Sequence, residues 1–309
     1  MRVVSFILLT SASLGLTKPL VHDVAAIEVL QTLTTRTVSP AYINNTAETF
    51  QDCLAAKNVP VFFATSSGFS QLAEPYNLRL AYTPAVIVVP TDAGQVADAV
   101  LCAAASNVKV QAKSGGHSYA SFSSGGQDGS MVIDLQSFQD INVDPEEYHR
   151  AKVGAGVRLG DLALSLYNQS QRALPHGTCP GVGVGGHATH GGYGYSSRAW
   201  GLTLDLIIGA DVVLANGSFV HVSAEEYPDI YYALRGAADS FGIIIYFYFQ
   251  TKPAPSAVVN WSYTIPGMST SAATSAAVFK KIQDFALNPS FVDRKLAFGY
   301  VLLNSYLLL

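Results

Sequence analysis

Apolar and polar positions from residue 85 onward follow a strand, helix, strand order. Residues 85–90 form an apolar run that predicts a buried strand, and residues 91–107 repeat apolar positions on one helical face. Residues 108–113 return to a strand pattern. This order predicts two parallel strands joined by a helical crossover, with Asp92 and Gln95 capping the start of the helix.

The same patterning continues to residue 255. The further elements predicted are a strand over 131–135, a strand, helix and short strand within 149–175, two strands around Asn216-Gly217, a helix over 227–236 and a strand over 241–250. Asn-Gly between two apolar runs is a strong hairpin signal. We expect the helix within 149–175 to bury Leu162, Leu166 and Tyr167. Pro253-Ala254-Pro255 then interrupts the pattern and marks a boundary.

Residues 256–309 carry a second, shorter set of patterns. Strands are predicted over 258–265 and 294–303, with a helix over 269–287 between them. The helix residues expected to pack inward are Ala273, Ala277, Phe279 and Ile282. One such unit leaves a sheet edge and a sheet face uncovered, so we interpret this segment as the beginning of an incomplete domain.

The first residues resemble a secretory leader. Arg2 precedes an apolar stretch over 3–9, and small residues follow over 11–15. We assign a signal peptide to residues 1–18, with an N-terminal strand as the alternative, and expect residues 24–79 to form a helical, strand-poor lead-in. The stretch is too short to span a membrane. Acceptors for N-glycosylation, compatible with a secreted glycoprotein, occur at Asn44, Asn168, Asn216 and Asn260.

Composition narrows the classes of partner. With 309 residues, 49% of them hydrophobic and 13% charged, the chain can form one large domain or two with well-buried sheets. The net charge of -4 gives no electrostatic basis for binding nucleic acid or an anionic membrane surface.

The three cysteines divide into a pair and a single thiol. Cys53 and Cys102 lie in helix-like segments, and we predict a disulfide between them. Cys179 lies among glycines and is left over. An unpaired thiol in an oxidising compartment usually has a covalent role, so Cys179 is a candidate functional residue.

Two glycine-rich segments are the candidate ligand site. Residues 114–119, Ser-Gly-Gly-His-Ser-Tyr, directly follow a predicted parallel strand, where such folds receive ligands. Residues 174–216 hold the second segment, and no Asp or Glu occurs between Asp161 and Asp205. A ligand there meets backbone amides, hydroxyls, imidazoles and one thiol, which favours an anionic or aromatic ligand close to the main chain.

Three other interpretations of the second segment are weaker. Gly181, Gly183 and Gly186 match the letters of a dinucleotide fingerprint, but no strand is expected before them, and the residues after them are too glycine-rich for the required helix. A zinc cluster drawn from His176, Cys179, His187 and His190 lacks the compact hairpin of such sites, so we predict no metal. A Cys-His hydrolase is disfavoured because Pro180 follows the thiol instead of a helix.

Together the motifs resemble a known flavoprotein family. GGHSY, HGTCPGVGVGGH, GYG, WGL and ALRGA followed by FGI are similar to motifs of proteins with the vanillyl-alcohol-oxidase-like, or PCMH-type, FAD-binding fold. Within it the chain looks like the berberine-bridge-like branch, and HGTC resembles the secreted fungal glucooligosaccharide and chitooligosaccharide oxidases. The resemblance implies an α+β fold. Its FAD-binding domain, residues 80–255, would consist of two α/β subdomains, followed by a substrate domain with an antiparallel sheet.

The resemblance also implies specific contacts with the cofactor. It implies two covalent bonds to FAD, one from His117 to the flavin 8α-methyl group and one from Cys179 to flavin C6. The residues it places around the cofactor are Ser114, Gly115, Gly116, His117, Ser118, Tyr119, Cys179, Val182, Gly183, Gly186, His187, Gly191, Gly192, Gly242 and Ile243. Among these, Gly242 and Ile243 would lie against the isoalloxazine edge.

The implied activity is oxidation of the C1 hydroxyl of an oligosaccharide to a lactone, with O2 reduced to H2O2. Tyr119 matches a family position near the flavin and the sugar, and Val182 matches a position that is small in oxidases. The resemblance places the family's general base beyond Leu309. The sequence is therefore interpreted as a truncated chain, and whether that chain is an active oxidase is left open. Oxidation of a small secondary metabolite and a noncatalytic remnant are the alternatives.

Overall fold

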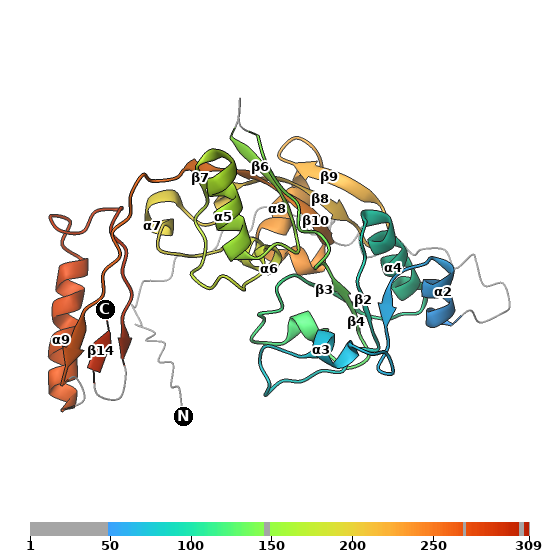
Figure 1. Cartoon of the computed structure of the whole chain (residues 1–309), viewed down its shortest axis with the longest axis horizontal. Helices are drawn as coiled ribbons and strands as arrows, with labels where there is room; N and C mark the ends of the chain where they lie inside the picture. The colour runs from blue at the N-terminus through green and yellow to red at the C-terminus, as the bar shows by residue number, and fades with distance from the viewer. Residues whose placement is uncertain (1–48, 145–148, 268–269, 303–305, 309) are drawn as a thin grey trace, which may run out of the picture. The chain divides into compact units, whose positions relative to one another are not determined.

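A computed structural model of the chain describes residues 49–144, 149–267, 270–302 and 306–308 (Figure 1). The predicted signal peptide, the lead-in before residue 49 and the acceptor Asn44 lie outside the described residues. Within the lead-in, residues 49–79 contain two short helices, α2 (Phe50–Ala56) and α3 (Phe69–Ala73), and one two-residue strand, β1 (Val61–Phe62). The helical, strand-poor character predicted for this segment is therefore confirmed where it is described.

The first sheet contains the predicted parallel strands. Its order is β1-β2-β4-β3, with β2 at Val86–Val88, β3 at Val110–Lys113 and β4 at Met131–Asp134. Strands β2 and β3 each pair with β4 in parallel, and β1 is antiparallel to β2. The predicted parallel direction is confirmed, but β2 and β3 are not neighbours. The third strand, β4, is buried along its whole length and inserts between them.

Helix α4 (Ala93–Ala105) is the crossover between β2 and β3. The Asp92 side chain accepts a hydrogen bond from the Gln95 amide at 2.9 Å, and Gln95 Oε1 accepts one from the Thr91 amide at 2.8 Å. The predicted disulfide is confirmed, because Cys102 of α4 is bonded to Cys53 of α2 with their Cα atoms 5.8 Å apart.

The second sheet is entirely antiparallel, in the order β5-β6-β10-β8-β9. Its strands are β5 (Ile141–Val143), β6 (Arg150–Gly154), β8 (Ile207–Val213), β9 (Phe219–Ser223) and β10 (Ile243–Gln250). The predicted hairpin joins β8 to β9, and the Asn216 side chain accepts from the Ser218 amide at 3.0 Å. Gly217 has a φ of 79°, the left-handed conformation for which the Asn-Gly signal was specific.

Short helices accompany this sheet. They are α5 (Leu159–Ser170), α6 (Val184–Thr189), α7 (Ser197–Trp200), α8 (Pro228–Ala237) and the 3-10 turns η2 (Leu204–Leu206) and η3 (Ala238–Ser240). The 3-10 turn η1 (Phe122–Ser124) contacts β3 of the first sheet. A small antiparallel pair joins β7 (Arg172–Ala173) to β11 (Lys252–Pro253). Leu162 and Leu166 are buried as predicted, but Tyr167 is 54% exposed. Helix α6 ends at Thr189, so only the first three of the residues 187–195 judged too glycine-rich for a helix are helical, and the glycine-rich remainder is not.

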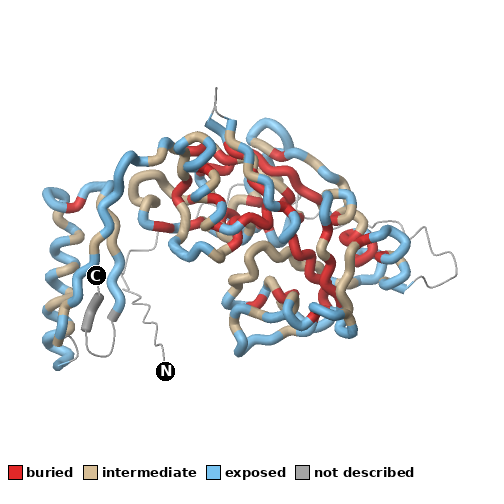
Figure 2. The backbone as a smooth tube through the Cα atoms, in the orientation of Figure 1, coloured by how far each residue is buried: buried red, intermediate tan, exposed pale blue. Residues whose placement is uncertain are grey.

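The hydrophobic core follows the two sheets. Figure 2 shows the buried residues concentrated along the central strands. In β10 the residues Ile245, Phe247 and Phe249 are fully buried, whereas the intervening Tyr246 and Tyr248 are only partly covered. This alternation fits a sheet with one face in the core and one nearer to solvent.

Residues 256–267, 270–302 and 306–308 contain a third antiparallel sheet and one helix. The sheet order is β12-β14-β13, from Thr264–Pro266, Tyr306–Leu308 and Val301–Leu302, and the helix α9 covers Ala272–Ala286. The antiparallel sheet is confirmed, but the strands are shorter than predicted. The inward packing of Ala273 and Ala277 is wrong, because both are exposed, and Phe279 and Ile282 are only partly covered. Within the described residues no helix is long and apolar enough to cross a membrane.

Candidate functional site

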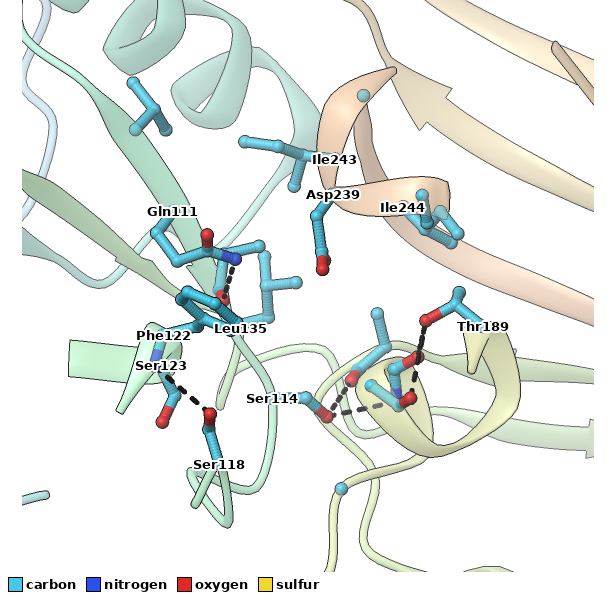
Figure 3. Close-up of a pocket in the computed structure, with 18 of the residues that line it drawn as sticks. Gln111, Ser114, Ser118, Phe122, Ser123, Leu135, Thr189, Asp239, Ile243 and Ile244 are labelled. Atoms are coloured by element: carbon cyan, nitrogen blue, oxygen red, sulfur yellow. Dashed lines mark hydrogen bonds between the residues drawn. The ribbon is translucent and has the colours of Figure 1, made fainter. Parts of the chain in front are cut away.

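A cavity of about 650 Å³ lies between the first and the second sheet. Its walls come from α4, β3, the loop after β3, the loop that leads into α6, the end of β8, and η3 with the start of β10. Figure 3 shows Gln111, Ser114, Leu135, Asp239 and Ile243 around this space. The predicted site residues that line it are Ser114, Gly115, Gly116, His117, Ser118, Val182, Gly183, Gly186, His187, Gly242 and Ile243.

The two glycine-rich segments touch each other at this cavity. A Cβ on Gly115 would lie 2.7 Å from the Gly183 Cα, and a Cβ on Gly183 would lie 2.8 Å from the Gly115 Cα. Carbon atoms at such distances overlap, so neither position accepts a side chain without movement of the backbone. The sequence therefore uses glycine here to bring two backbone segments together, and with them the amides that face the cavity.

Ser114 holds this junction together. Its hydroxyl donates to the Ala155 carbonyl at 2.5 Å and accepts from the Gly185 amide at 3.3 Å (Figure 3). One side chain thus connects the end of β3, the residue after β6 and the first turn of α6. The position of the second glycine segment relative to the first is fixed by protein contacts alone.

Gly186 lines the cavity for a different reason. A Cβ at this position would meet no protein atom within 4 Å. Nothing in the described protein requires glycine there, in contrast to Gly115 and Gly183. A bare backbone that faces an open cavity is what a ligand pressed against the main chain needs.

His117 stands where both segments meet. Its ring stacks on Tyr76 with centroids 4.4 Å apart and planes at 24°. A Cβ on Gly181 would lie 3.1 Å from His117 Nε2, so the second glycine segment passes directly beside the imidazole. Partial burial, and next the charge of Arg158, lower the pKa of His117 below its usual value. The ring is therefore favoured in its neutral form, in which one nitrogen has a free lone pair.

His187 is held neutral by its surroundings. Burial, and next the neighbouring His176, lower the pKa of His187 to about 4. The Gly177 amide donates to its Nε2 at 3.1 Å, so this nitrogen is an acceptor. A neutral imidazole at the cavity wall presents no net charge to a bound ligand.

His190 and Asp239 face each other across the cavity wall. His190 Nε2 lies 3.3 Å from Asp239 Oδ2, and His190 Nδ1 lies 3.1 Å from the Gly186 carbonyl oxygen. Asp239 comes from η3, directly before β10, and its side chain points into the cavity (Figure 3). Sequence reasoning did not select this residue, since a single Asp in a polar turn has no distinctive local pattern. Gln111 and Phe122 were missed in the same way.

Four predicted residues do not line this cavity. Tyr119 is 77% exposed, and its ring contacts the Tyr76 ring in an edge-to-face arrangement with the ring centroids 5.6 Å apart. Cys179 is exposed and unpaired, two residues before Gly181. Gly191 and Gly192 lie outside the lining, and a Cβ on Gly192 would lie 2.5 Å from the Thr203 Cβ. Glycine at 192 is thus required by contact with the protein itself.

A second cavity, of about 670 Å³, lies along the same loop and shares Ser114, Gly115, Gly116 and His117 with the first. Lys113 and Asp134 contribute to it as an ion pair at 3.1 Å, and Lys113 also donates to the Leu72 carbonyl at 2.9 Å. The loop that carries His117 is therefore accessible from two cavities. Among the described residues, no group of three or more His, Cys, Asp and Glu side chains is placed to hold a metal ion.

Comparison with known proteins identifies the domain. Residues 84–223 match the family model described as FAD binding domain. The chain is 49% identical to a xylooligosaccharide oxidase of Thermothelomyces thermophilus over 220 residues, which are 71% of this chain and 44% of the relative. It is 46% identical to a chitooligosaccharide oxidase of Gibberella zeae over 220 residues, 69% of this chain and 44% of the relative. The chain spans about half the length of the curated relatives it matches.

Solved structures agree with these relationships. The structure of glucooligosaccharide oxidase from Acremonium strictum, described with a 6-S-cysteinyl, 8α-N1-histidyl FAD, superposes with a TM-score of 0.77 at 39% identity. The match covers 84% of this chain and 53% of that one. The predicted α+β fold of the PCMH type is thereby confirmed.

Proposed function

Since residues 84–223 belong to the FAD-binding domain family, we propose that this protein is an FAD-dependent carbohydrate oxidase whose cofactor occupies the cavity between the two sheets. The observation that carries the proposal is the junction of the glycine segments, where Gly115 and Gly183 bring two backbones into contact and Gly186 leaves the main chain bare toward the cavity. Backbone amides without side chains can approach phosphate oxygens and a flat ring closely.

The residues present fit FAD in their hydrogen-bonding groups and in the apolar character of one end of the cavity. The phosphates would meet the amides and hydroxyls of Ser114 to Ser118, and an apolar end with Val100, Val108 and Val213 would take the adenine. In that orientation Gly242 and Ile243 accompany the adenosine end, because Ile243 pairs with Val213 across the sheet. This proposed placement differs from the isoalloxazine edge that the resemblance implies. When bound, the flavin supplies a two-electron acceptor for hydride transfer, and the protein supplies attachment and orientation.

Two covalent links, from His117 and from Cys179, are part of the proposal. Each link would replace a C–H bond of the flavin and an N–H or S–H bond of the protein, and the two electrons released would pass through the flavin to O2. The lowered pKa of His117 keeps its ring nitrogen available for bond formation, and the stacked Tyr76 fixes the plane of the ring. Gly181 touches that imidazole, and Cys179 lies two residues earlier with an exposed thiol. Both candidate nucleophiles thus belong to backbone segments that meet at one place. The 6-S-cysteinyl, 8α-N1-histidyl FAD of the glucooligosaccharide oxidase supports this assignment.

The proposed substrate is an oligosaccharide, oxidised at its C1 hydroxyl to a lactone while O2 is reduced to H2O2. The xylo-, chito- and glucooligosaccharide oxidases among the relatives support this class. Tyr119 is the residue of this chain proposed to lie beside the sugar, where its exposed ring is suited to stack on a pyranose. We place the protein outside the cell, because the Cys53–Cys102 disulfide is typical of oxidising compartments.

The decisive experiment is mass spectrometry of the denatured full chain with peptide maps around His117 and Cys179. We expect one FAD attached to both peptides. His117→Ala should leave a flavin on the cysteine peptide only, and Cys179→Ala one on the histidine peptide only. His149→Asn is the matched control, because His149 is an exposed histidine with a φ of 50°, which Asn tolerates.

Two results would contradict the proposal. A folded wild-type chain that carries no flavin and binds none on titration would refute the cofactor site. A chain that carries flavin but shows no anaerobic bleaching of the flavin with xylo-, chito- or gluco-oligosaccharides would refute sugar oxidation by this chain while leaving the cofactor assignment in place.

A further inference from the structure

Apart from its histidines, the cofactor cavity is lined by one acidic or basic side chain among the described residues, and that side chain is an aspartate. Among the described residues that line it, Asp239 is the only Asp, Glu, Lys or Arg, and the other titratable groups are the imidazoles of His117, His187 and His190. A cavity proposed for a diphosphate would be expected to present a cation or neutral donors. A carboxylate there therefore needs an explanation.

The carboxylate is fixed in place by one partner. Its Oδ2 lies 3.3 Å from His190 Nε2, and the opposite nitrogen of that ring lies within hydrogen-bond distance of the Gly186 carbonyl and of Thr189 Oγ1, at 3.1 and 3.0 Å. Thr189 Oγ1 in turn donates to the Gly185 carbonyl at 2.9 Å. This chain of contacts connects η3 to α6, and it orients Asp239 from the side of the second glycine segment.

The other carboxylate oxygen is available to a ligand. Within the described part of the chain no hydrogen bond is made to Asp239 Oδ1, and the side chain is 48% exposed. Figure 3 shows it pointing into the space bounded by Ser114 and Ser118 on one side and Ile243 on the other. An ionised carboxylate is an acceptor only, so it repels phosphate oxygens and attracts hydroxyl groups.

We propose that Asp239, oriented by His190, binds the hydroxyl groups of the polyol parts of FAD, and so determines which segment of the cofactor lies opposite the glycine loops. This inference rests on the proposed flavin site and adds a binding residue to it. FAD has two such segments, the ribose of its adenosine half and the ribityl chain of its flavin half. In other dinucleotide sites an acidic side chain accepts a hydrogen bond from a ribose hydroxyl.

The alternative is that the His190–Asp239 pair only links η3 to α6 within the protein. Loss of such a link would lower the stability of the fold without a specific effect on the cofactor. The two interpretations differ in the affinity of the folded protein for FAD. A direct contact lowers this affinity when Asp239 is removed, whereas a purely structural link does not.

The test uses the full chain with His117→Ala and Cys179→Ala, because binding is then reversible. FAD, FMN and ADP are titrated into this background and into the same background with Asp239→Asn or Asp239→Ala. Asp229→Asn, an acidic residue of α8 that does not line the cavity, is the matched control. Urea denaturation of each variant reports its folded fraction.

We expect Asp239→Ala to weaken FAD binding about 10- to 100-fold, as for loss of hydrogen bonds to a charged group, and Asp239→Asn to weaken it less. If the variants also bind ADP more weakly, the carboxylate contacts the ribose. If they also bind FMN more weakly, it contacts the ribityl chain. A Kd for FAD within twofold of the background in both variants overturns the inference, whether or not the urea midpoint changes. If the background fails to bind FAD, the flavin content of the wild-type chain decides, and a wild-type chain without flavin overturns the inference and the proposed function together.

Discussion

Replacement of Gly183 by alanine tests the junction of the two glycine segments directly. The new methyl group would overlap the backbone nitrogen of Gly115 and lie 2.8 Å from its Cα, and the Ser114 hydroxyl occupies the same space. Backbone atoms cannot rotate away as a side chain can, so the two segments must separate. Overpacking by one methylene costs about 1–3 kcal/mol when side chains can adjust. Here we expect about 3 kcal/mol or more.

The matched control is the same substitution three residues later. A Cβ on Gly186 meets no protein atom within 4 Å, and the residue lies inside α6, where alanine is favoured over glycine by about 0.5–1 kcal/mol. We therefore expect Gly186→Ala to keep the stability of the wild type within about 1 kcal/mol. Its methyl group projects into unoccupied space, so any loss should concern FAD binding and not folding.

Urea denaturation followed by circular dichroism measures both variants. A typical domain is stable by about 5–15 kcal/mol, so a loss of about 3 kcal/mol moves the midpoint clearly. If the free energy of unfolding of Gly183→Ala lies within about 0.5 kcal/mol of the wild-type value, the two glycine segments are not in contact. The junction that supports the proposed FAD site would then not exist. If Gly186→Ala lowers the free energy of unfolding as much as Gly183→Ala does, then Gly186 does not face open space as described, and the distinction between the two glycines is wrong.

Three further perturbations follow from contacts described above. The first is the double substitution Cys53→Ala/Cys102→Ala, which removes a disulfide between cysteines 49 residues apart in the sequence. It should lower the free energy of unfolding by about 4 kcal/mol, because the unfolded chain loses a constraint. Lys113→Met should cost about 3 kcal/mol or more, because it leaves the buried Asp134 without its cation. The third perturbation is a change of pH. The pKa of His187 is lowered to about 4 in the folded state, so the unfolded chain binds the proton more readily. The free energy of unfolding should therefore fall by about 1–2 kcal/mol as the pH decreases from 6.5 to 4.

Each of these has its own control. A wild-type chain treated with reductant should match the cysteine double variant in urea midpoint, and disagreement between them would contradict the first expectation. Lys113→Met combined with Asp134→Asn should recover part of the loss, and strict additivity of the two would contradict the ion pair. His187→Gln should flatten the pH dependence, because its carbonyl can replace the acceptor for Gly177, and an unchanged slope would assign the titration to another group.

Local signals predicted the elements that depend on neighbouring residues. Asp92 and Gln95 located the start of α4, Asn216-Gly217 located the β8–β9 turn, and the two helical cysteines indicated their disulfide. The position of β4 between β2 and β3 was not predicted, because strand order depends on pairing between distant segments that no local pattern records.

The failures share a physical cause. Tyr167 and Ala273 lie on helical faces that look buried from periodicity, but periodicity defines a face and not what covers it. The glycine loops of the candidate site were found because GGHSY and HGTC are distinctive. Asp239 was missed because its proximity to His190 arises only when η3 and α6 come together.

The disulfide has a consequence for the cofactor cavity. Cys102 lies on α4, and two other residues of the same helix, Val100 and Ala104, form part of the wall of the cofactor cavity. The bond to α2 therefore secures the outside of a helix whose other side is proposed to contact FAD. Reduction of this bond is therefore expected to loosen one wall of the cavity as well as to lower the stability of the fold.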